Sequence, residues 1–179
     1  MDSQQRRNRI ALIGLRGAGK STLGRELGKA LAVPFIELDS EIEREAGVPL
    51  GEIFSLYGQD AYRGLERRCL ENVIELHGRA VIAAGGSLVT EPETFETLRS
   101  SCFTIWLRAS SEEHMQRVID QGDMRPITGR AESMSYLKKL LEERDSLYRL
   151  ADATLDTAGQ TVPQSLAELK AMSTILQVA

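Results

Sequence analysis

The chain of 179 residues carries 22 basic and 26 acidic residues, and its length suits one domain with one substantial core. The net charge of -4 gives no overall reason to expect nucleic-acid binding, and no apolar run is long enough to span a bilayer. Two widely separated cysteines, Cys69 and Cys102, have no partner at metal-ligand spacing, which favours reduced thiols in a cytoplasmic protein.

The first predicted elements surround a glycine-rich loop. Residues 10–13 form a short apolar run that predicts a buried strand, and residues 23–31 carry leucine and alanine at helical spacing. Between them, residues 14–22 read Gly-Leu-Arg-Gly-Ala-Gly-Lys-Ser-Thr and match the phosphate-loop pattern G-x-x-x-x-G-K-S/T at every position. Strand, loop and helix together are the context that a nucleotide-phosphate site requires.

This loop predicts a site for MgATP. Its glycines let backbone N–H groups turn inward, and with the N-terminus of the following helix they form a positive cradle for phosphate oxygens. Lys20 would reach the β- and γ-phosphates, Ser21 would hold Mg²⁺ through its hydroxyl, and Thr22 would hydrogen-bond nearby phosphate or backbone. The predicted nucleotide-binding residues of the loop are Gly17, Ala18, Gly19, Lys20, Ser21 and Thr22.

Two acidic residues lie at the end of the second predicted strand, over 34–38. Glu37 and Asp39 are two positions apart, so their carboxylates point the same way if the chain is extended. One of them could reach Mg²⁺ through water while the other meets the hydroxyl of an acceptor. Asp39 or Ser40 is equally expected as the cap of the helix that follows, to about Ala46.

Two helices are expected next, over 49–57 and over 59–77, with a break at Gly58. The second carries apolar residues at spacings of three and four, which makes it amphipathic. Arg63 and Glu66, three positions apart on this helix, could form an ion pair. An arginine on a helix is, however, more often solvated than bound to a ligand.

A third strand is predicted over 80–84 and a fourth over 102–107, with a helix over 93–99 between them. Gly85 and Gly86 follow the third strand directly. Two glycines at a strand end either let a ligand approach the backbone closely or form a plain turn into the next helix. The pattern leaves both interpretations open.

The last third of the chain contains a polar loop. Ser110 or Ser111 is expected to cap a helix that ends near Gly122, and the loop over 122–130 has the composition of a mobile segment. Arg125 in this loop could close over phosphates and neutralise their charge. The remaining expected elements are a helix over 132–150, a strand over 153–156 and a helix over 162–176.

Helices alternate with strands throughout, and most of the strands are continuously apolar. This pattern predicts an α/β fold with a parallel sheet that is covered by helices on both faces. Ligands in such folds lie beyond the carboxyl ends of the strands, where Lys20, Asp39 and Gly85 are expected. Residues 1–8 are expected to form a flexible basic tail and residues 9–179 a single domain.

Several motifs follow one another in a fixed order. They are the phosphate loop at 14–22, Leu-Asp-Ser-Glu-Ile-Glu at 38–43, Tyr-Arg-Gly-Leu-Glu at 62–66, the pair Gly85-Gly86, the pair Arg125-Pro126, and Arg144 four residues before Tyr148. In this order and spacing the chain resembles the shikimate kinases, from about Arg9 to about Leu176. The resemblance implies a five-stranded P-loop sandwich of three layers, like the nucleoside-monophosphate kinases, with a mobile lid over about 122–131.

The same resemblance implies an activity. Shikimate kinases transfer the γ-phosphoryl group of MgATP to the 3-hydroxyl of shikimate, a step toward chorismate and the aromatic amino acids, and usually act as cytoplasmic monomers. Lys20, Asp39 and Arg125 would be catalytic. The other roles implied are substrate binding by Asp39, Arg63, Gly85, Gly86 and Arg144, nucleotide binding by Arg117 and Arg125, and metal binding by Ser21 and Glu37.

Three positions differ from the family's usual residues: Glu37 replaces an aspartate, Gly64 a charged residue, and Ser87 the last glycine of a triplet. Residues 113–118 and 121–126 resemble a second group, the shikimate-kinase-like domains that follow a helix-turn-helix in regulators and bind benzoyl-coenzyme A. On this alternative the domain would sense the thioester without turnover. A third possibility is another small-molecule kinase that shares the loop, such as a gluconate kinase.

Overall fold

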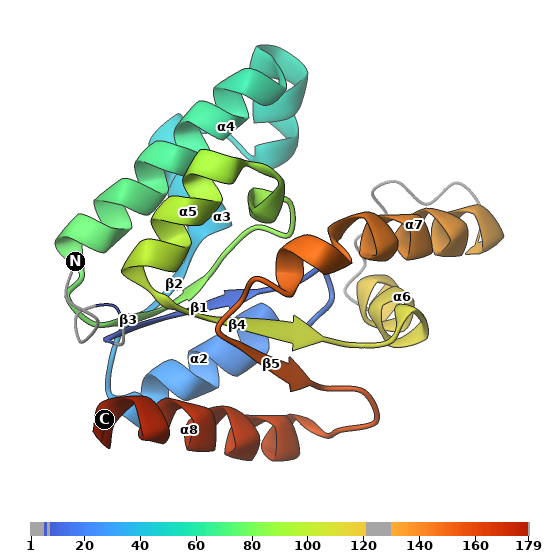
Figure 1. Ribbon diagram of the computed structural model, residues 1–179. Coiled ribbons are helices and arrows are strands. Elements are labelled where there is room, and N and C mark those ends of the chain that lie inside the picture. The colour runs from blue at the N-terminus through green and yellow to red at the C-terminus, as the bar shows by residue number, and fades with distance from the viewer. Residues whose placement is uncertain (1–5, 7, 121–129, 179) are drawn as a thin grey trace.

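The computed structural model describes residues 6, 8–120 and 130–178. For residues 115, 117–120, 130–133 and 174–178 it describes the backbone but not the side chains. Within the described residues the centre is a five-stranded parallel sheet in the order β2-β3-β1-β4-β5 (Figure 1). The strands are β1 (Arg9–Ile13), β2 (Phe35–Glu37), β3 (Ala80–Ala83), β4 (Phe103–Arg108) and β5 (Ala153–Asp156). The five predicted strands and the parallel α/β sheet are confirmed.

Helices cover both faces of the sheet, with α2 and α8 on one face and α4 and α5 on the other (Figure 1). In the part of the chain that is described, no helix combines the length and the apolar character needed to cross a membrane. The helices are α2 (Lys20–Leu31), α3 (Leu38–Ala46), α4 (Leu50–Leu76), α5 (Pro92–Ser101), α6 (Ser111–Asp120), α7 (Arg130–Tyr148) and α8 (Val162–Val178), with a 3-10 helix η1 (Leu88–Thr90).

Alternate residues of the same strands build the two halves of the core. On β1, Leu12 belongs to an apolar cluster with Leu27 of α2 and Leu169 of α8. Its neighbour Ile13 belongs to the opposite cluster, with Leu70 of α4 and Leu98 of α5. Since the helices occupy both faces, the carboxyl ends of the strands and the loops that follow them are left to form a site.

Helix α3 begins without the side-chain cap that the sequence predicted. Its N-cap residue is Glu37, which makes no capping hydrogen bond through its side chain, and Asp39 already lies in the first turn. The strand passes into the helix without an intervening residue, and the fully buried Leu38 anchors the first turn. The prediction that Asp39 or Ser40 caps this helix is therefore wrong.

Two other local predictions are confirmed. Gly58 interrupts α4 with a φ of 78° and a ψ of 178°, where the sequence predicted a break. Ser110 caps α6, because its hydroxyl accepts the Glu113 N–H at 3.2 Å while the Glu113 carboxylate accepts the Ser110 N–H at 3.2 Å. Arg6, within the predicted tail, pairs with Asp152 at 2.7 Å.

Candidate active site

The phosphate loop joins β1 to α2, and its shape depends on glycine. Gly14, Gly17 and Gly19 have φ angles of 141°, 76° and 91°, a region that residues with a Cβ rarely adopt. At Gly14 a Cβ would also lie 2.6 Å from the carbonyl oxygen of Leu107 on the neighbouring strand. The backbone geometry of the loop therefore requires these glycines.

The Lys20 ammonium is held inside the loop. Its Nζ donates to the carbonyl oxygens of Gly14 at 2.7 Å and Leu15 at 3.0 Å. Burial lowers the pKa of Lys20 to about 8, against the opposing effect of the Asp39 and Glu37 carboxylates. A buried cation whose hydrogen-bond acceptors are neutral carbonyls is well suited to exchange them for charged phosphate oxygens.

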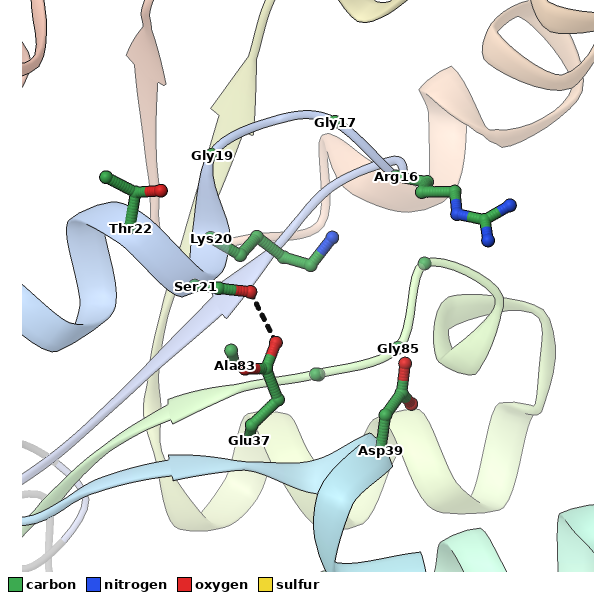
Figure 2. Close-up of a pocket in the computed structure, with 12 residues that line it drawn as sticks. Arg16, Gly17, Gly19, Lys20, Ser21, Thr22, Glu37, Asp39, Ala83 and Gly85 are labelled. Atoms are coloured by element: carbon green, nitrogen blue, oxygen red, sulfur yellow. Dashed lines mark hydrogen bonds between the residues drawn. The ribbon is translucent and has the colours of Figure 1, made fainter. Parts of the chain in front are cut away.

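Ser21, Glu37 and Asp39 line a cavity of about 150 Å³ in front of the loop (Figure 2). The Ser21 hydroxyl donates a hydrogen bond to the Glu37 carboxylate. Burial raises the pKa of Asp39, although the Lys20 ammonium opposes this effect. Among the described residues, Asp39 Oδ1 has no hydrogen-bond partner. The two carboxylates expected at this point are thus brought together, although Asp39 lies on a helix rather than a strand.

A second cavity, of about 550 Å³, adjoins the first and shares Arg16, Asp39, Gly85 and Gly86 with it. Asp39 therefore lies at the boundary between the two. The remaining lining is mainly apolar and aromatic, with Ser87 and one arginine. It consists of Leu15, Leu50, Phe54, Tyr62, Ser87, Tyr136, Leu140 and Arg144.

Helix α7 contributes Arg144 to the second cavity and holds it in place. Arg144 Nη1 donates to the carbonyl oxygen of Gly86 at 3.0 Å, and the Tyr148 hydroxyl donates to the same oxygen at 2.6 Å. Tyr148 also stacks on Trp106 of β4, with ring centroids 5.5 Å apart. These contacts fix the end of α7 against the segment after β3, so that the guanidinium lies at the cavity wall.

Arg63, the other predicted carboxylate-binding arginine, is engaged differently. Its Nη1 donates to Glu66 at 2.6 Å, and its Nε lies 3.0 Å from the Glu91 carboxylate. It does not belong to the described lining of the second cavity. Glu66 connects Arg63 to the second cavity, because its carboxylate also accepts a hydrogen bond from the hydroxyl of the lining residue Tyr62 at 3.1 Å. The predicted ion pair of Arg63 with Glu66 is confirmed.

Gly85 is surrounded by polar side chains. A Cβ at this position would lie 3.1 Å from Asp39 Oδ1, 3.2 Å from Glu66 Oε1 and 3.4 Å from the Tyr62 hydroxyl. Burial raises the pKa of Glu66, and the hydrogen bond from Arg63 opposes this. Close packing of these side chains is thus one reason for glycine at the end of β3.

A third cavity, of about 390 Å³, also adjoins the phosphate loop and shares Gly17, Gly19 and Thr22 with the first. It is lined by Gly17 and Thr22 of the loop and its helix, and by Thr157, Gln160 and Val162 from the segment that joins β5 to α8. Asp39 is not part of its described lining. The sequence analysis did not single out the segment after β5.

Two predicted nucleotide-binding arginines lie outside what is described. Arg125 falls within residues 121–129, which include nearly all of the lid predicted over 122–131. Arg117 lies in α6, where the backbone is described but this side chain is not.

The sequence analysis also missed several residues of the second cavity, among them Arg16, Phe54 and Tyr136. Arg16 occupies a variable position of the phosphate-loop motif, which assigns no role to it. Phe54 and Tyr136 lie on helices, and apolar spacing alone does not distinguish a residue that lines a cavity from one that packs in the core. All three line the second cavity.

The chain is similar to known proteins. The family model described as shikimate kinase matches residues 16–176. A shikimate kinase of Nitrobacter winogradskyi is 39% identical over 154 residues, which cover 86% of this chain and 70% of that protein. The chain belongs to the shikimate kinase family.

Solved structures of shikimate kinases have the same fold. The enzyme from Acinetobacter baumannii, in complex with shikimate, gives a TM-score of 0.83 at 31% identity and covers 95% of this chain and 93% of its own. A gluconokinase from Sinorhizobium meliloti gives a TM-score of 0.60 at 22% identity over 97% of both chains, which shows a common fold alone. The predicted P-loop kinase fold is confirmed, and the family membership favours a kinase over a regulator domain.

Proposed function

We propose that the protein transfers the γ-phosphoryl group of ATP to the 3-hydroxyl of shikimate. The observation that carries this proposal is the place of Asp39, at the boundary of the first and second cavities and with Oδ1 unpartnered among the described residues. A carboxylate at this boundary can orient an acceptor hydroxyl toward the γ-phosphate and take up its proton. The second cavity is accordingly called the acceptor cavity below.

Charge neutralisation would supply most of the remaining catalysis. Lys20 would leave the carbonyl oxygens of Gly14 and Leu15 and bind the β- and γ-phosphates. Arg125, on the predicted lid, would add a second cation to the phosphates once the lid closes. The N-terminus of α2 adds the fixed dipole of a helix end.

The oxygen atoms of Ser21 and Glu37 fit Mg²⁺, which prefers oxygen ligands and keeps several of its own waters. Ser21 would bind the ion directly and Glu37 through water. Bound Mg²⁺ supplies positive charge beside the phosphates. The third cavity, next to Gly17 and Thr22, would take the nucleoside, with Arg117 against the adenine.

The carboxylate of the acceptor would bind Arg144, because a guanidinium matches a carboxylate with two parallel hydrogen bonds. Arg63 would support the same end of the acceptor cavity from beside it, through Glu66 and Tyr62. The shikimate bound to the Acinetobacter relative supports an acceptor of this size and charge. The protein would act as a monomer in the cytoplasm.

A thioester-binding domain without turnover is the second candidate. One observation favours it: much of the acceptor cavity is lined by apolar and aromatic side chains, which would suit the phenyl ring of benzoyl-coenzyme A. These side chains include Leu50, Phe54, Tyr136 and Leu140. Shikimate has a smaller apolar surface than the benzoyl group. Comparing the binding of the two ligands therefore distinguishes the two candidate functions.

The test is a coupled assay of ADP release with MgATP and shikimate. The parent protein should turn over, and Lys20→Ala should reduce turnover by roughly 10²-fold or more, because a charged group facing the transferred phosphoryl is lost. Lys29→Ala is the matched control, since Lys29 is an exposed lysine on the same helix and should be dispensable. MgADP should raise the melting temperature of the parent and of Lys29→Ala, but much less that of Lys20→Ala.

Two outcomes would reject the kinase. The first is a parent protein that binds MgADP and releases no ADP with shikimate. The second is stabilisation by benzoyl-coenzyme A together with no ADP release, which would favour the sensor domain instead.

A further inference from the structure

Arg63 lies between two carboxylates that differ in their contact with water. Its Nη1 donates to Glu66 at 2.6 Å, and its Nε lies 3.0 Å from Oε1 of Glu91. The Glu66 side chain is fully buried, whereas 34% of the Glu91 side chain is exposed. Because an exposed carboxylate can be hydrated when it leaves its partner and a buried one cannot, Glu91 is the exchangeable partner of Arg63.

The contact of Arg63 with Glu91 is also poorly aligned. Arg63 Nε is a buried atom, and within the described part of the chain it makes no hydrogen bond of acceptable geometry, although Glu91 is close by. A buried donor without an aligned acceptor costs free energy, which another acceptor in a better position would recover. The guanidinium therefore retains a donor for a ligand.

Glu91 holds the guanidinium away from the acceptor cavity. Arg63 and Glu91 line a separate cavity of about 440 Å³, between α4 and the start of α5, two helices that lie side by side (Figure 1). Arg63 does not belong to the described lining of the acceptor cavity. Glu91 is the residue at which η1 ends and α5 begins, so both elements fix the position of its backbone.

The acceptor cavity is nevertheless close to Arg63. Cζ of Arg63 lies 5.3 Å from the centroid of the Tyr62 ring, and Tyr62 lines the acceptor cavity. The Tyr62 hydroxyl and the Arg63 guanidinium donate to the same carboxylate, that of Glu66. By rotation of its long side chain, a guanidinium that leaves Glu91 could keep Glu66 and turn past Tyr62 toward the acceptor.

We propose that the Glu91 carboxylate competes with the carboxylate of the acceptor for Arg63 and so lowers the affinity for the acceptor. Glu91 is a positioning residue, because it touches no substrate and acts through Arg63. The acceptor replaces it when two parallel hydrogen bonds join its carboxylate to the guanidinium. The inference rests on the proposed function and deepens it, because it names the group that opposes binding of the acceptor.

The test compares shikimate with its carboxamide, in which a neutral amide replaces the carboxylate, as acceptors for the parent and Glu91→Gln. Glu91→Gln should lower the KM of shikimate about threefold, a change of the size expected for a partly exposed ion pair. The KM of the carboxamide should change much less, since a neutral group does not compete for the charge. The change should appear in KM rather than in kcat, because Glu91 acts on binding of the acceptor.

The substitution should leave the start of α5 intact, because Glu91 makes no capping hydrogen bond through its side chain. Glu93→Gln is the matched control, since Glu93 is an exposed residue of the same helix and pairs with Arg67. It should keep both KM values of the parent. In an Arg63→Met background, Glu91→Gln should have no effect on the KM of shikimate, whereas a merely structural effect would persist.

Three results would overturn the inference. The first is a KM of shikimate that is unchanged or raised in Glu91→Gln. The second is an equal fall in the KM of the carboxamide, because the competition would then not concern a carboxylate. The third is an equal fall in the Arg63→Met background, because Glu91 would then not act through Arg63.

Failure of the proposed function is distinguishable from failure of this inference. Absence of turnover in the parent rejects the kinase, and calorimetric binding of shikimate then takes the place of KM. Tighter binding by Glu91→Gln than by the parent and Glu93→Gln supports the inference. Equal or weaker binding by Glu91→Gln, or no binding by any of the three proteins, overturns it.

Discussion

Gly86 packs closely against the backbone of the phosphate loop because it has no side chain. A Cβ there would lie 3.3 Å from the carbonyl oxygen of Gly14 and 3.4 Å from the amide nitrogen of Arg16. Since both are backbone atoms, Gly86→Ala should displace the loop and weaken MgADP binding by about 1 kcal/mol or more. Calorimetric titration measures this, with Gly78→Ala as control, because a Cβ at Gly78 meets no atom within 4 Å. Equal affinities of the two variants would contradict the expectation.

The sequence predicts the role of a side chain best when a motif fixes both its type and its position. Lys20 and Ser21 lie at the phosphate cavity as the motif predicts. The pair of Arg63 with Glu66 follows from helical spacing alone. The position of Arg16 at the cavities could not be predicted in this way. The contacts that hold its backbone come from segments far away in the sequence, at Gly86 and His114.

At the scale of elements, two of the glycines in α4 should respond oppositely to replacement by alanine. Gly58 has backbone angles that are almost restricted to glycine, whereas Gly64 lies in regular helix, and neither would bring a Cβ within 4 Å of another atom. Gly58→Ala should therefore lower the free energy of unfolding by about 1 to 3 kcal/mol. Gly64→Ala should raise it by about 0.5 to 1 kcal/mol. Urea unfolding of both variants gives the signs, and a loss of stability in Gly64→Ala would count against this account.

Arg9, at the start of β1, holds the ends of two helices. Its buried guanidinium donates to the carbonyl oxygens of His77 at 2.6 Å, Ile74 at 2.9 Å and Ser101 at 3.4 Å, near the C-termini of α4 and α5. Arg9→Met would leave these carbonyls without their donor, and we expect a loss of about 2 to 3 kcal/mol of unfolding free energy. The exposed Arg79→Met is the control. Equal urea midpoints for both variants would show that Arg9 is dispensable.

Elements with a strong local signal are predicted well. Most of the strands are apolar because helices cover both faces of the sheet, and all five appear where expected. The cap of α3 is mispredicted because the choice between a cap and the first turn depends on the burial of Leu38, a tertiary effect. The 3-10 helix η1 was not predicted, since three residues are too short for a periodic signal.

At the scale of the whole molecule, the parallel sheet gathers distant segments at one edge. The carboxyl ends of β1, β2 and β3 supply Lys20, Glu37 and Gly85 to one cavity, as the α/β pattern predicts. The sequence does not predict which of these side chains line each cavity at this edge. Arg144 reaches the acceptor cavity and Arg63 lies beside it because α7 and α4 pack at particular positions, which no local pattern specifies.

Cys102 reports on the whole fold, because it is fully buried between α5 and β4. Burial raises the pKa of its thiol to about 12, whereas an unfolded thiol titrates near about 8.5. Raising the pH from about 7 to about 9 should therefore accelerate alkylation of the unfolded chain strongly, while the native thiol stays protonated and covered. In a Cys69→Ala background, native labelling should proceed through global opening and slow by the factor 1 + [MgADP]/Kd, where [MgADP] is the free concentration. Labelling that MgADP does not slow would instead indicate local opening around the start of β4.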